Sequence, residues 1–129
     1  MTYPFYCLIA AYALVYLSKL PLGIAMHREG ERGYDNRHPR AQQARLTGWG
    51  ARALAAHQNG FEIMPLFAVA VITAHLFQAD PGWSAIWAAT FVVSRLLYIV
   101  MYLVDWNLLR STVWTVGLVC CVALFVLAA

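Results

Sequence analysis

The sequence predicts an all-α integral membrane protein built as a bundle of four transmembrane helices. Hydrophobic residues make up 62% of its 129 residues and charged residues only 12%, about half the charged share typical of a soluble domain. Apolar runs near the ~20 residues that a bilayer core requires recur four times along the chain. Residues 1–129 are therefore expected to form one transmembrane domain, with helices at about residues 3–26, 47–77, 83–104 and 111–128.

The first segment, residues 3–26, is apolar except for Ser18 and Lys19. Pro21 is expected to kink this helix, because proline removes a backbone donor and crowds the preceding turn. Lys19 can extend its ammonium group toward the nearer membrane interface. No Lys or Arg precedes the apolar run, so we interpret it as a retained helix and not as a cleaved signal peptide.

Residues 27–46 form a polar, glycine-containing stretch with five arginines. Loop backbone must lie outside the hydrocarbon, because its polar groups cannot be satisfied there. An excess of arginine marks this loop as cytoplasmic, which places both termini on the non-cytoplasmic side. Five of the nine basic residues cluster in this loop, so the net charge of +3 indicates topology and not nucleic-acid binding.

The other three segments follow from turn signals. Residues 47–77 would span roughly 45 Å at 1.5 Å per residue, so the first turns of this helix are expected to project beyond the membrane. Residues 78–82 contain Asp80-Pro81-Gly82, which predicts a tight turn before residues 83–104. The chain then returns through residues 105–110, and Ser111 or Thr112 could cap the last helix, residues 111–128.

The three cysteines, Cys7, Cys120 and Cys121, lie in apolar helical runs and lack metal-ligand spacing. Adjacent cysteines on a helix point in different directions, so a Cys120–Cys121 disulfide is not expected. Free cysteine behaves as a small hydrophobic residue. We therefore predict that all three pack in the bundle, and that the protein has no metal site.

Polar residues cluster on two neighbouring helices. Arg52, Ala55, Asn59 and Glu62 share one face of the second segment at helical spacing. Intramembrane polar groups of this kind should face a protein interior or a ligand. On the third segment, one face carries Arg95, Tyr98 and Tyr102 at i, i+3 and i+7.

Glu62 and Arg95 lie at matching depth when residues are counted outward from the turn near Asp80. An unpaired charge would be costly there, so an ion pair between them is predicted. It would lock the two helices together and so hold the Asn59 and Tyr98–Tyr102 face in place. Arg110 is either a topology or headgroup-binding arginine, or an anion or thiolate partner at the membrane boundary. His57 lies on a different face from Asn59 and is interpreted as interfacial.

Three motifs together resemble the MAPEG family, the membrane-associated proteins in eicosanoid and glutathione metabolism. They are Asn59-x-x-Glu62-x-x-Pro65-Leu66-Phe67 in the second segment, Arg95-x-x-Tyr98-x-x-x-Tyr102 in the third, and Arg110-Ser111 at the start of the fourth. The resemblance covers the chain from Thr47 onward, and the four-helix topology agrees with it. Each motif alone is weak, but their order is fairly specific.

The resemblance implies a homotrimer of four-helix protomers, with glutathione bound between neighbouring subunits near the cytoplasmic face. It implies that Arg110 stabilises the glutathione thiolate, since a nearby cation lowers the pKa of a thiol. A hydrophobic small-molecule substrate would reach that thiolate from the membrane lipids. The other residues that the resemblance assigns to the glutathione site are Arg52, Asn59, Glu62, Tyr98, Tyr102 and Ser111, with Arg95 pairing Glu62.

Two departures from the family pattern leave other functions open. Active members commonly carry an arginine four residues before the asparagine, where this chain has Ala55; Arg52 lies one turn earlier on the same face. Trp114 stands where some members have a tyrosine. The leading hypothesis is a glutathione transferase or peroxidase acting on lipophilic electrophiles or lipid hydroperoxides. The alternatives are a lipid-binding scaffold without turnover and, more distantly, a transporter in which Glu62 carries protons.

Overall fold

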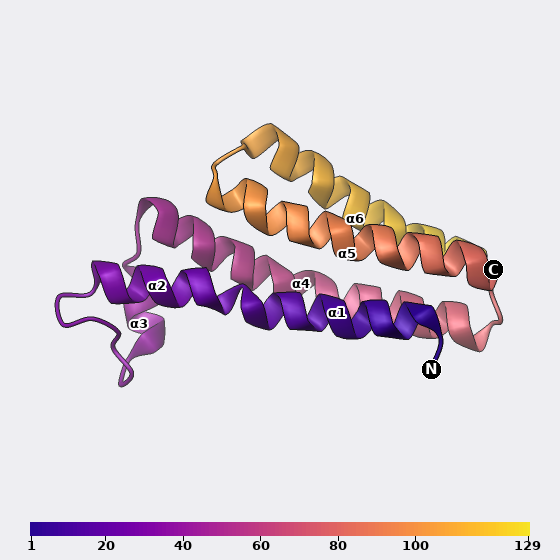
Figure 1. Ribbon diagram of the computed structural model, residues 1–129, viewed down its shortest axis with the longest axis horizontal. Coiled ribbons are helices and arrows are strands. Elements are labelled where there is room, and N and C mark those ends of the chain that lie inside the picture. Colours follow the sequence, from indigo (N-terminus) through magenta and orange to yellow (C-terminus); the bar gives the residue numbers. More distant parts are fainter.

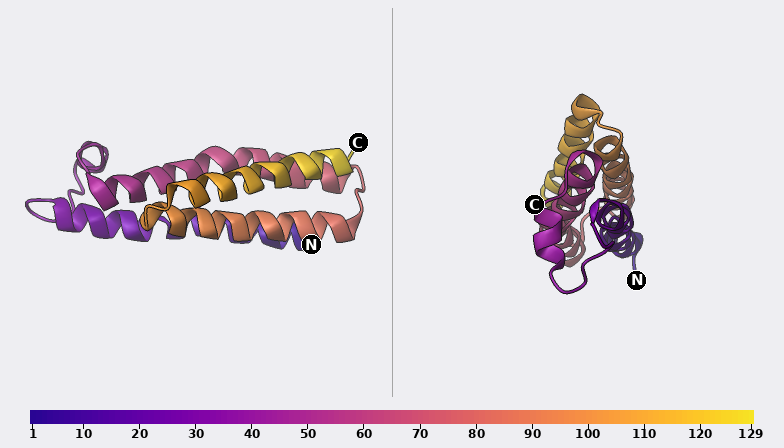
Figure 2. Two further views of the ribbon diagram at one scale, coloured as in Figure 1. Left: turned by 90° about the horizontal axis from the view of Figure 1, so that it is seen from above. Right: turned by 90° about the vertical axis from the view of Figure 1, so that its left-hand side faces the viewer.

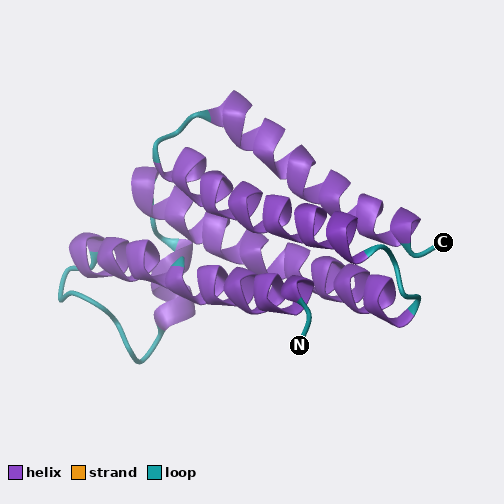
Figure 3. Ribbon diagram, turned by 45° about the vertical axis from the view of Figure 1, so that its right-hand side comes forward, coloured by secondary structure: helices purple, strands orange, loops and turns teal.

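The computed structural model describes residues 1–129 and contains helices and loops only (Figures 1 and 3). Four helical segments are long and apolar enough to cross a membrane, spanning Tyr3–Glu29, Gly48–Leu76, Pro81–Leu103 and Asn107–Leu127. They run side by side, and both termini lie at the end opposite the longest loop (Figures 1 and 2). Six helices make up these segments and the loop: α1 Tyr3–Leu17, α2 Lys19–Glu29, α3 Pro39–Ala44, α4 Gly48–Leu76, α5 Pro81–Leu103 and α6 Asn107–Leu127.

The outer surface of the bundle is apolar. Large hydrophobic side chains remain exposed along the helices, including Val93 and Leu96 on α5 and Val119 and Val122 on α6. A soluble monomer rarely exposes contiguous apolar surface on this scale. The four-helix membrane fold predicted from composition and pattern is therefore confirmed.

The first spanning segment is interrupted at Ser18, which separates α1 from α2. Helix α1 ends at Leu17. In a continuous helix the Leu17 carbonyl would accept from the backbone N–H of residue 21, but Pro21 has no N–H to donate. Helix α1 thus ends four residues before the proline, and the break at Ser18 follows directly. Ser18 is buried, and its hydroxyl donates to the Val15 carbonyl at 2.6 Å and lies 2.8 Å from Nδ1 of His57 on α4. The contact between Ser18 and His57 ties the break to α4.

The loop between α2 and α4 is fixed by side chains. The Nε2 of Gln42 on α3 donates to the carbonyls of Met26 and Gly33, at 2.9 Å each. The Oε1 of the same side chain accepts from the Asp35 backbone N–H at 2.9 Å. One buried glutamine therefore joins α2, α3 and the loop. Where residues 27–46 were expected to be one loop, α2 continues to Glu29 and α3 occupies Pro39–Ala44.

Helices α5 and α6 begin earlier than the sequence suggested. Asp80 accepts a hydrogen bond from the Trp83 backbone N–H at 2.8 Å, so α5 starts at Pro81, where the fixed φ of proline suits the first helical position. Asp105 takes a positive φ of 63°, and this tight turn lets α6 start at Asn107. Ser111 therefore lies inside α6 and does not cap it. Its hydroxyl donates to the Asn107 carbonyl of its own helix at 3.1 Å.

The main core lies in the half of the bundle near the termini. Phe67 of α4 stacks on Phe91 of α5, with ring centroids 3.7 Å apart. Cys7, Cys120 and Cys121 are buried there as free thiols, as predicted. A smaller apolar cluster packs α2 against α4 at the arginine-rich end. The polar residues of α4 and α5 lie between these two clusters.

Candidate functional site

Helix α4 meets α5 through a bridging asparagine. The Nη2 of Arg95 on α5 donates to Oδ1 of Asn59 on α4 at 2.7 Å, and Nδ2 of Asn59 donates to Oε2 of Glu62 at 3.0 Å. Glu62 and Arg95 form no direct ion pair. The predicted pair is thus wrong for the single chain, because the Asn59 amide occupies the space between the two charges. The amide still links them, since it accepts from the cation and donates to the anion.

Arg95 is buried in the bundle, with 4% of its surface exposed. Its Nη1 has no hydrogen-bond partner, and Nη2 binds a neutral amide oxygen. The guanidinium carbon lies 4.2 Å from the centroid of the Tyr98 ring, and this cation–π contact offsets part of the desolvation. Arg95 is therefore a rigidly held internal cation with one donor group still free.

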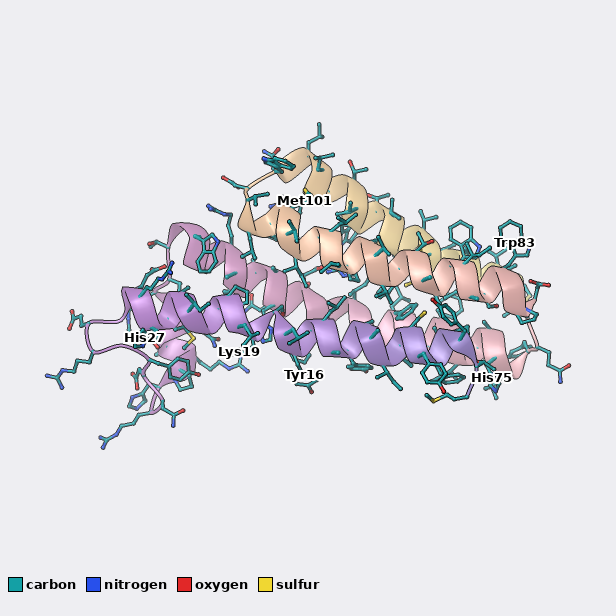
Figure 4. The ribbon with its side chains drawn as sticks, in the orientation of Figure 1. Tyr16, Lys19, His27, His75, Trp83 and Met101 are labelled. Carbon is teal, nitrogen blue, oxygen red and sulfur yellow. The ribbon has the colours of Figure 1, made fainter.

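The contact between Arg95 and Tyr98 continues toward the arginine-rich end. The Tyr98 and Tyr102 rings meet edge to face with centroids 5.5 Å apart. The guanidinium carbon of Arg110, in the first turn of α6, lies 4.5 Å from the Tyr102 centroid. We call these four side chains, Arg95, Tyr98, Tyr102 and Arg110, the Arg–Tyr stack. Met101, which is labelled in Figure 4, directly precedes Tyr102 near the end of α5.

The Arg–Tyr stack explains how Arg110 is oriented. Aromatic faces attract guanidinium groups, by about 0.5–1 kcal/mol when exposed and about 2 kcal/mol when desolvated. Arg110 is half-buried, so one face of its guanidinium lies on Tyr102 while its N–H groups remain able to bind an anion. A cation held in this way at a helix start can stabilise a thiolate or a carboxylate.

Glu62 presents its carboxylate on the surface of the single chain, in the middle of a membrane-spanning helix. A carboxylate at such a position is costly when it faces lipid. Its one side-chain contact is the hydrogen bond from Asn59. The position is therefore suited to a cationic or hydrogen-bonding partner outside the chain.

Arg52 lies near the start of α4, on the same side as Asn59. Its Nη1 is 3.8 Å from Oδ2 of Asp105 in the turn between α5 and α6, and its Nε is buried without a partner. The structure thus assigns Arg52 a partner that the sequence did not suggest. The available signal was a single carboxylate just past the end of α5. Ala55, one turn further along α4, provides no charge.

Ser111, like Arg52, is a predicted site residue that lies outside the contacts joining the others. It is exposed, and its hydroxyl bonds only to the backbone of α6. His57 is also separate, since it contacts Ser18 and Val15 of the first segment and packs edge to face on Phe61. The remaining six predicted side chains form one connected series: Glu62, Asn59, Arg95, Tyr98, Tyr102 and Arg110.

Gly117 of α6 supports this series and was missed by the sequence reading. A Cβ at this position would lie 3.0 Å from the Ser94 hydroxyl oxygen and 3.8 Å from Cδ of Arg95. The glycine therefore lets α6 approach α5 closely beside the Arg95 side chain. Small residues commonly mark such helix contacts in membranes, so a lone glycine in a bulky apolar helix was the available signal.

The chemistry available at the site is that of anion binding and thiol activation. No group of three or more His, Cys, Asp or Glu side chains is placed to hold a metal ion. Instead the site joins a surface carboxylate and an amide to a cation that is oriented by aromatic rings. Such a set can hold a ligand that carries both an ammonium and acidic groups.

Comparison with known proteins identifies a family. The model of the MAPEG family matches residues 3–129, which is essentially the whole chain. No curated protein and no solved structure matches the chain significantly. The chain therefore belongs to the MAPEG family of membrane proteins.

Proposed function

We propose that this protein is a membrane glutathione transferase or peroxidase that activates the glutathione thiol toward lipophilic electrophiles or lipid hydroperoxides. The observation that carries the proposal is the unbroken series of contacts from Glu62 to Arg110, which draws on α4, α5 and α6. Family membership supports a membrane function in glutathione or eicosanoid metabolism in general.

In the proposed reaction, Arg110 stabilises the thiolate of bound glutathione. The thiol proton leaves to water, and the sulfur attacks the electrophilic carbon of the substrate while the leaving group departs with its electron pair. With a hydroperoxide, two glutathione molecules are oxidised to the disulfide as the hydroperoxide is reduced to an alcohol and water. Arg95 and the two tyrosines keep Arg110 in position, and Glu62 and Asn59 bind the polar end of glutathione.

We further propose a homotrimer, with glutathione held between neighbouring protomers. The exposed carboxylate of Glu62 supports this, because a neighbouring subunit and its bound glutathione would remove it from lipid. Static light scattering of the detergent-purified protein tests the assembly. A particle with the protein mass of three chains is expected, and a monomer with full glutathione binding would contradict it.

The proposal places the site near the cytoplasmic face, with both termini on the opposite side. Five arginines in residues 27–46 support this orientation. Fusing alkaline phosphatase, which is active only after export, to the C-terminus tests it. Activity of the fusion is expected, and an inactive phosphatase with an active cytoplasmic reporter would reverse the topology.

Ultraviolet difference absorbance of the thiolate tests the central step. Glutathione added to the wild-type trimer should produce a thiolate signal that is lost in Arg110→Ala. Arg37→Ala, which removes an exposed loop arginine, is the matched control and should retain the signal. If the wild type neither binds glutathione nor differs in activity from Arg110→Ala, the proposal fails.

A lipid-binding scaffold of the same fold, without turnover, is the second candidate. Two observations favour it: Ala55 stands where active members commonly carry arginine, and Arg52 is engaged by Asp105. Ala55→Arg separates the two functions. If the wild type is an enzyme, this variant should bind glutathione several-fold more tightly; a scaffold should bind lipid in both forms and conjugate glutathione in neither.

A further inference from the structure

A groove with a volume of about 490 Å³ follows the outer side of α2, away from the site on α4, α5 and α6. Its floor is formed by two adjacent rows of the helix, each with four-residue spacing. One row is Lys19, Gly23 and His27, and the other contains Leu20, Ile24 and Arg28; Tyr34 of the following loop completes the lining. None of these residues contributes to the Arg–Tyr stack or its Asn59–Glu62 extension.

The charge of the groove has one sign. Lys19 and Arg28 are cationic, His27 adds an imidazole, and no carboxylate lines the groove. None of these three side chains takes part in an ion pair within the chain. Glu29, the nearest acidic residue along α2, binds the Thr47 backbone N–H at 3.0 Å. The inner surface of the groove is almost wholly apolar, so the uncompensated positive charge lies at its rim.

Residues of the following loop lie beside both ends of the groove. The Lys19 ammonium lies 6.0 Å from the centroid of the Tyr34 ring. The neighbouring Gly33 packs on the His27 ring, since a Cβ there would be 3.1 Å from its Nδ1. Lys19 and His27 are two helical turns apart, yet both adjoin residues 33–34. Figure 4 labels these two side chains along the same helix, beside the loop.

The remaining lining is apolar and open. Leu20 and Ile24 are exposed on the outside of the bundle, in a helical segment that is long and apolar enough to cross a membrane. Gly23 faces empty space, since an added Cβ would meet nothing within 4 Å. A hydrocarbon chain can therefore lie along α2 over Gly23 while its polar end reaches the cations.

We propose that this groove binds one anionic phospholipid. Its phosphate lies between Lys19 and His27, with Arg28 adding charge, and an acyl chain runs over Gly23 against Leu20 and Ile24. Basic pockets at the arginine-rich side of membrane proteins are suited to anionic headgroups, and each Lys or Arg near the surface contributes about fivefold in affinity. The site goes beyond the proposed thiol chemistry and does not depend on it.

Native mass spectrometry of the full detergent-purified protein tests the proposal. The probes are phosphatidylglycerol and phosphatidylcholine with identical acyl chains. The wild type should bind phosphatidylglycerol at least tenfold more tightly. Lys19→Gln with Arg28→Gln should weaken that binding about 25-fold, which is about fivefold for each cation removed. The control pair, Arg32→Gln with Arg37→Gln, loses the same charge outside the groove and should bind like the wild type.

Gly23→Leu tests the acyl-chain part without changing charge. The variant should fold, because the added side chain has room and leucine is a better helix former than glycine. Because the leucine side chain fills the groove, the variant should bind phosphatidylglycerol at least tenfold more weakly. If inorganic phosphate displaces the lipid and Gly23→Leu binds it normally, the site is a plain anion site and the proposal is overturned. If Gly23→Leu changes the oligomer mass and not lipid binding, the groove is a subunit interface and the proposal is likewise overturned.

Discussion

Arg95 and Asn59 join α5 to α4 through a hydrogen bond of 2.7 Å between Nη2 and Oδ1. The bond connects a buried cation to a neutral acceptor, while the nearest carboxylate, Glu62, binds the other end of the same amide. The asparagine therefore lets the cation and the carboxylate act together without neutralising each other. Glu62 remains accessible to a ligand or a neighbouring chain.

Asn59→Leu should destabilise the fold. It leaves Nη2 of Arg95 without its acceptor, next to an Nη1 that already lacks one. Loss of a hydrogen bond to a buried charged group costs about 2 kcal/mol. Thermal unfolding in detergent should show a Tm several degrees lower, whereas Asn36→Leu in the exposed loop should leave it unchanged. Equal Tm values for the two variants would show that the Asn59–Arg95 bond contributes little.

Tyr102→Leu should lower glutathione conjugation about fivefold through loss of Arg110 positioning. The Tyr102 ring lies 4.5 Å from the Arg110 guanidinium carbon, and a contact of this kind is worth about 1 kcal/mol. Tyr102→Phe keeps the ring and should retain most of the conjugation rate. The thiolate absorbance and kcat of both variants provide the measurement. Similar losses in the two would assign the role to the hydroxyl and not to the ring.

Gly117→Val should destabilise the α5–α6 contact and displace Arg95. Even a Cβ would approach the Ser94 hydroxyl oxygen to 3.0 Å, and overpacking of this kind costs about 1–3 kcal/mol. Gly23→Ala is the matched helix-glycine control, because its Cβ meets nothing within 4 Å. Chemical denaturation in mixed micelles should give a lower midpoint for Gly117→Val alone. An unchanged midpoint would mean that α6 can shift without loss.

Asp35 should make the order of its loop depend on pH. Its Oδ1 accepts from the backbone N–H groups of His38 at 3.0 Å and Arg37 at 2.9 Å. The bond from His38 is the main cause that lowers the pKa of the Asp35 carboxyl below its ordinary value of 3.8; burial opposes it, and the bond from Arg37 adds to the lowering. The stabilisation is complete above the unfolded value and is lost as the pH falls through the lowered native value.

Hydrogen exchange at the Arg37 and His38 amides measures this effect. Both amides should be protected at neutral pH and lose protection at a pH below 4. Asp35→Ala should remove the protection at every pH. Asp35→Asn keeps an acceptor oxygen without a titrating group, so its remaining protection should not change in the acid range. Acid-dependent exchange in Asp35→Asn would assign the transition to another residue.

The four-helix bundle could be predicted from the sequence, because hydropathy and turn signals depend only on residues that are close together in the chain. Asp80-Pro81-Gly82 predicted the turn before α5. The helix starts two residues earlier than expected, because the Asp80 side chain caps it by accepting from the Trp83 backbone N–H. The start of α6 was harder to predict. It depends on the positive φ of Asp105, a conformation that no nearby glycine announced.

The contacts among the predicted site residues could not be derived from the sequence. Counting residues from the turn placed Glu62 and Arg95 at one depth, but depth does not fix how far each helix is rotated. That rotation brought Asn59 to Arg95 and left Glu62 on the surface. Arg52 shows the same limit, because its partner Asp105 belongs to a turn whose path could not be known from spacing.

The membrane-spanning helices differ in length, and α4 is longer than α6. Helix α4 has 29 residues and α6 has 21, which correspond to about 43 Å and about 31 Å at 1.5 Å per residue. At the arginine-rich end, α2, α3 and α4 extend past the turn between α5 and α6 (Figure 1). Arg110 thus lies at a step in the protein surface. For the proposed reaction this step would act as a phase boundary, at which a water-soluble thiol and an oil-soluble substrate each reach the same guanidinium without leaving their own solvent.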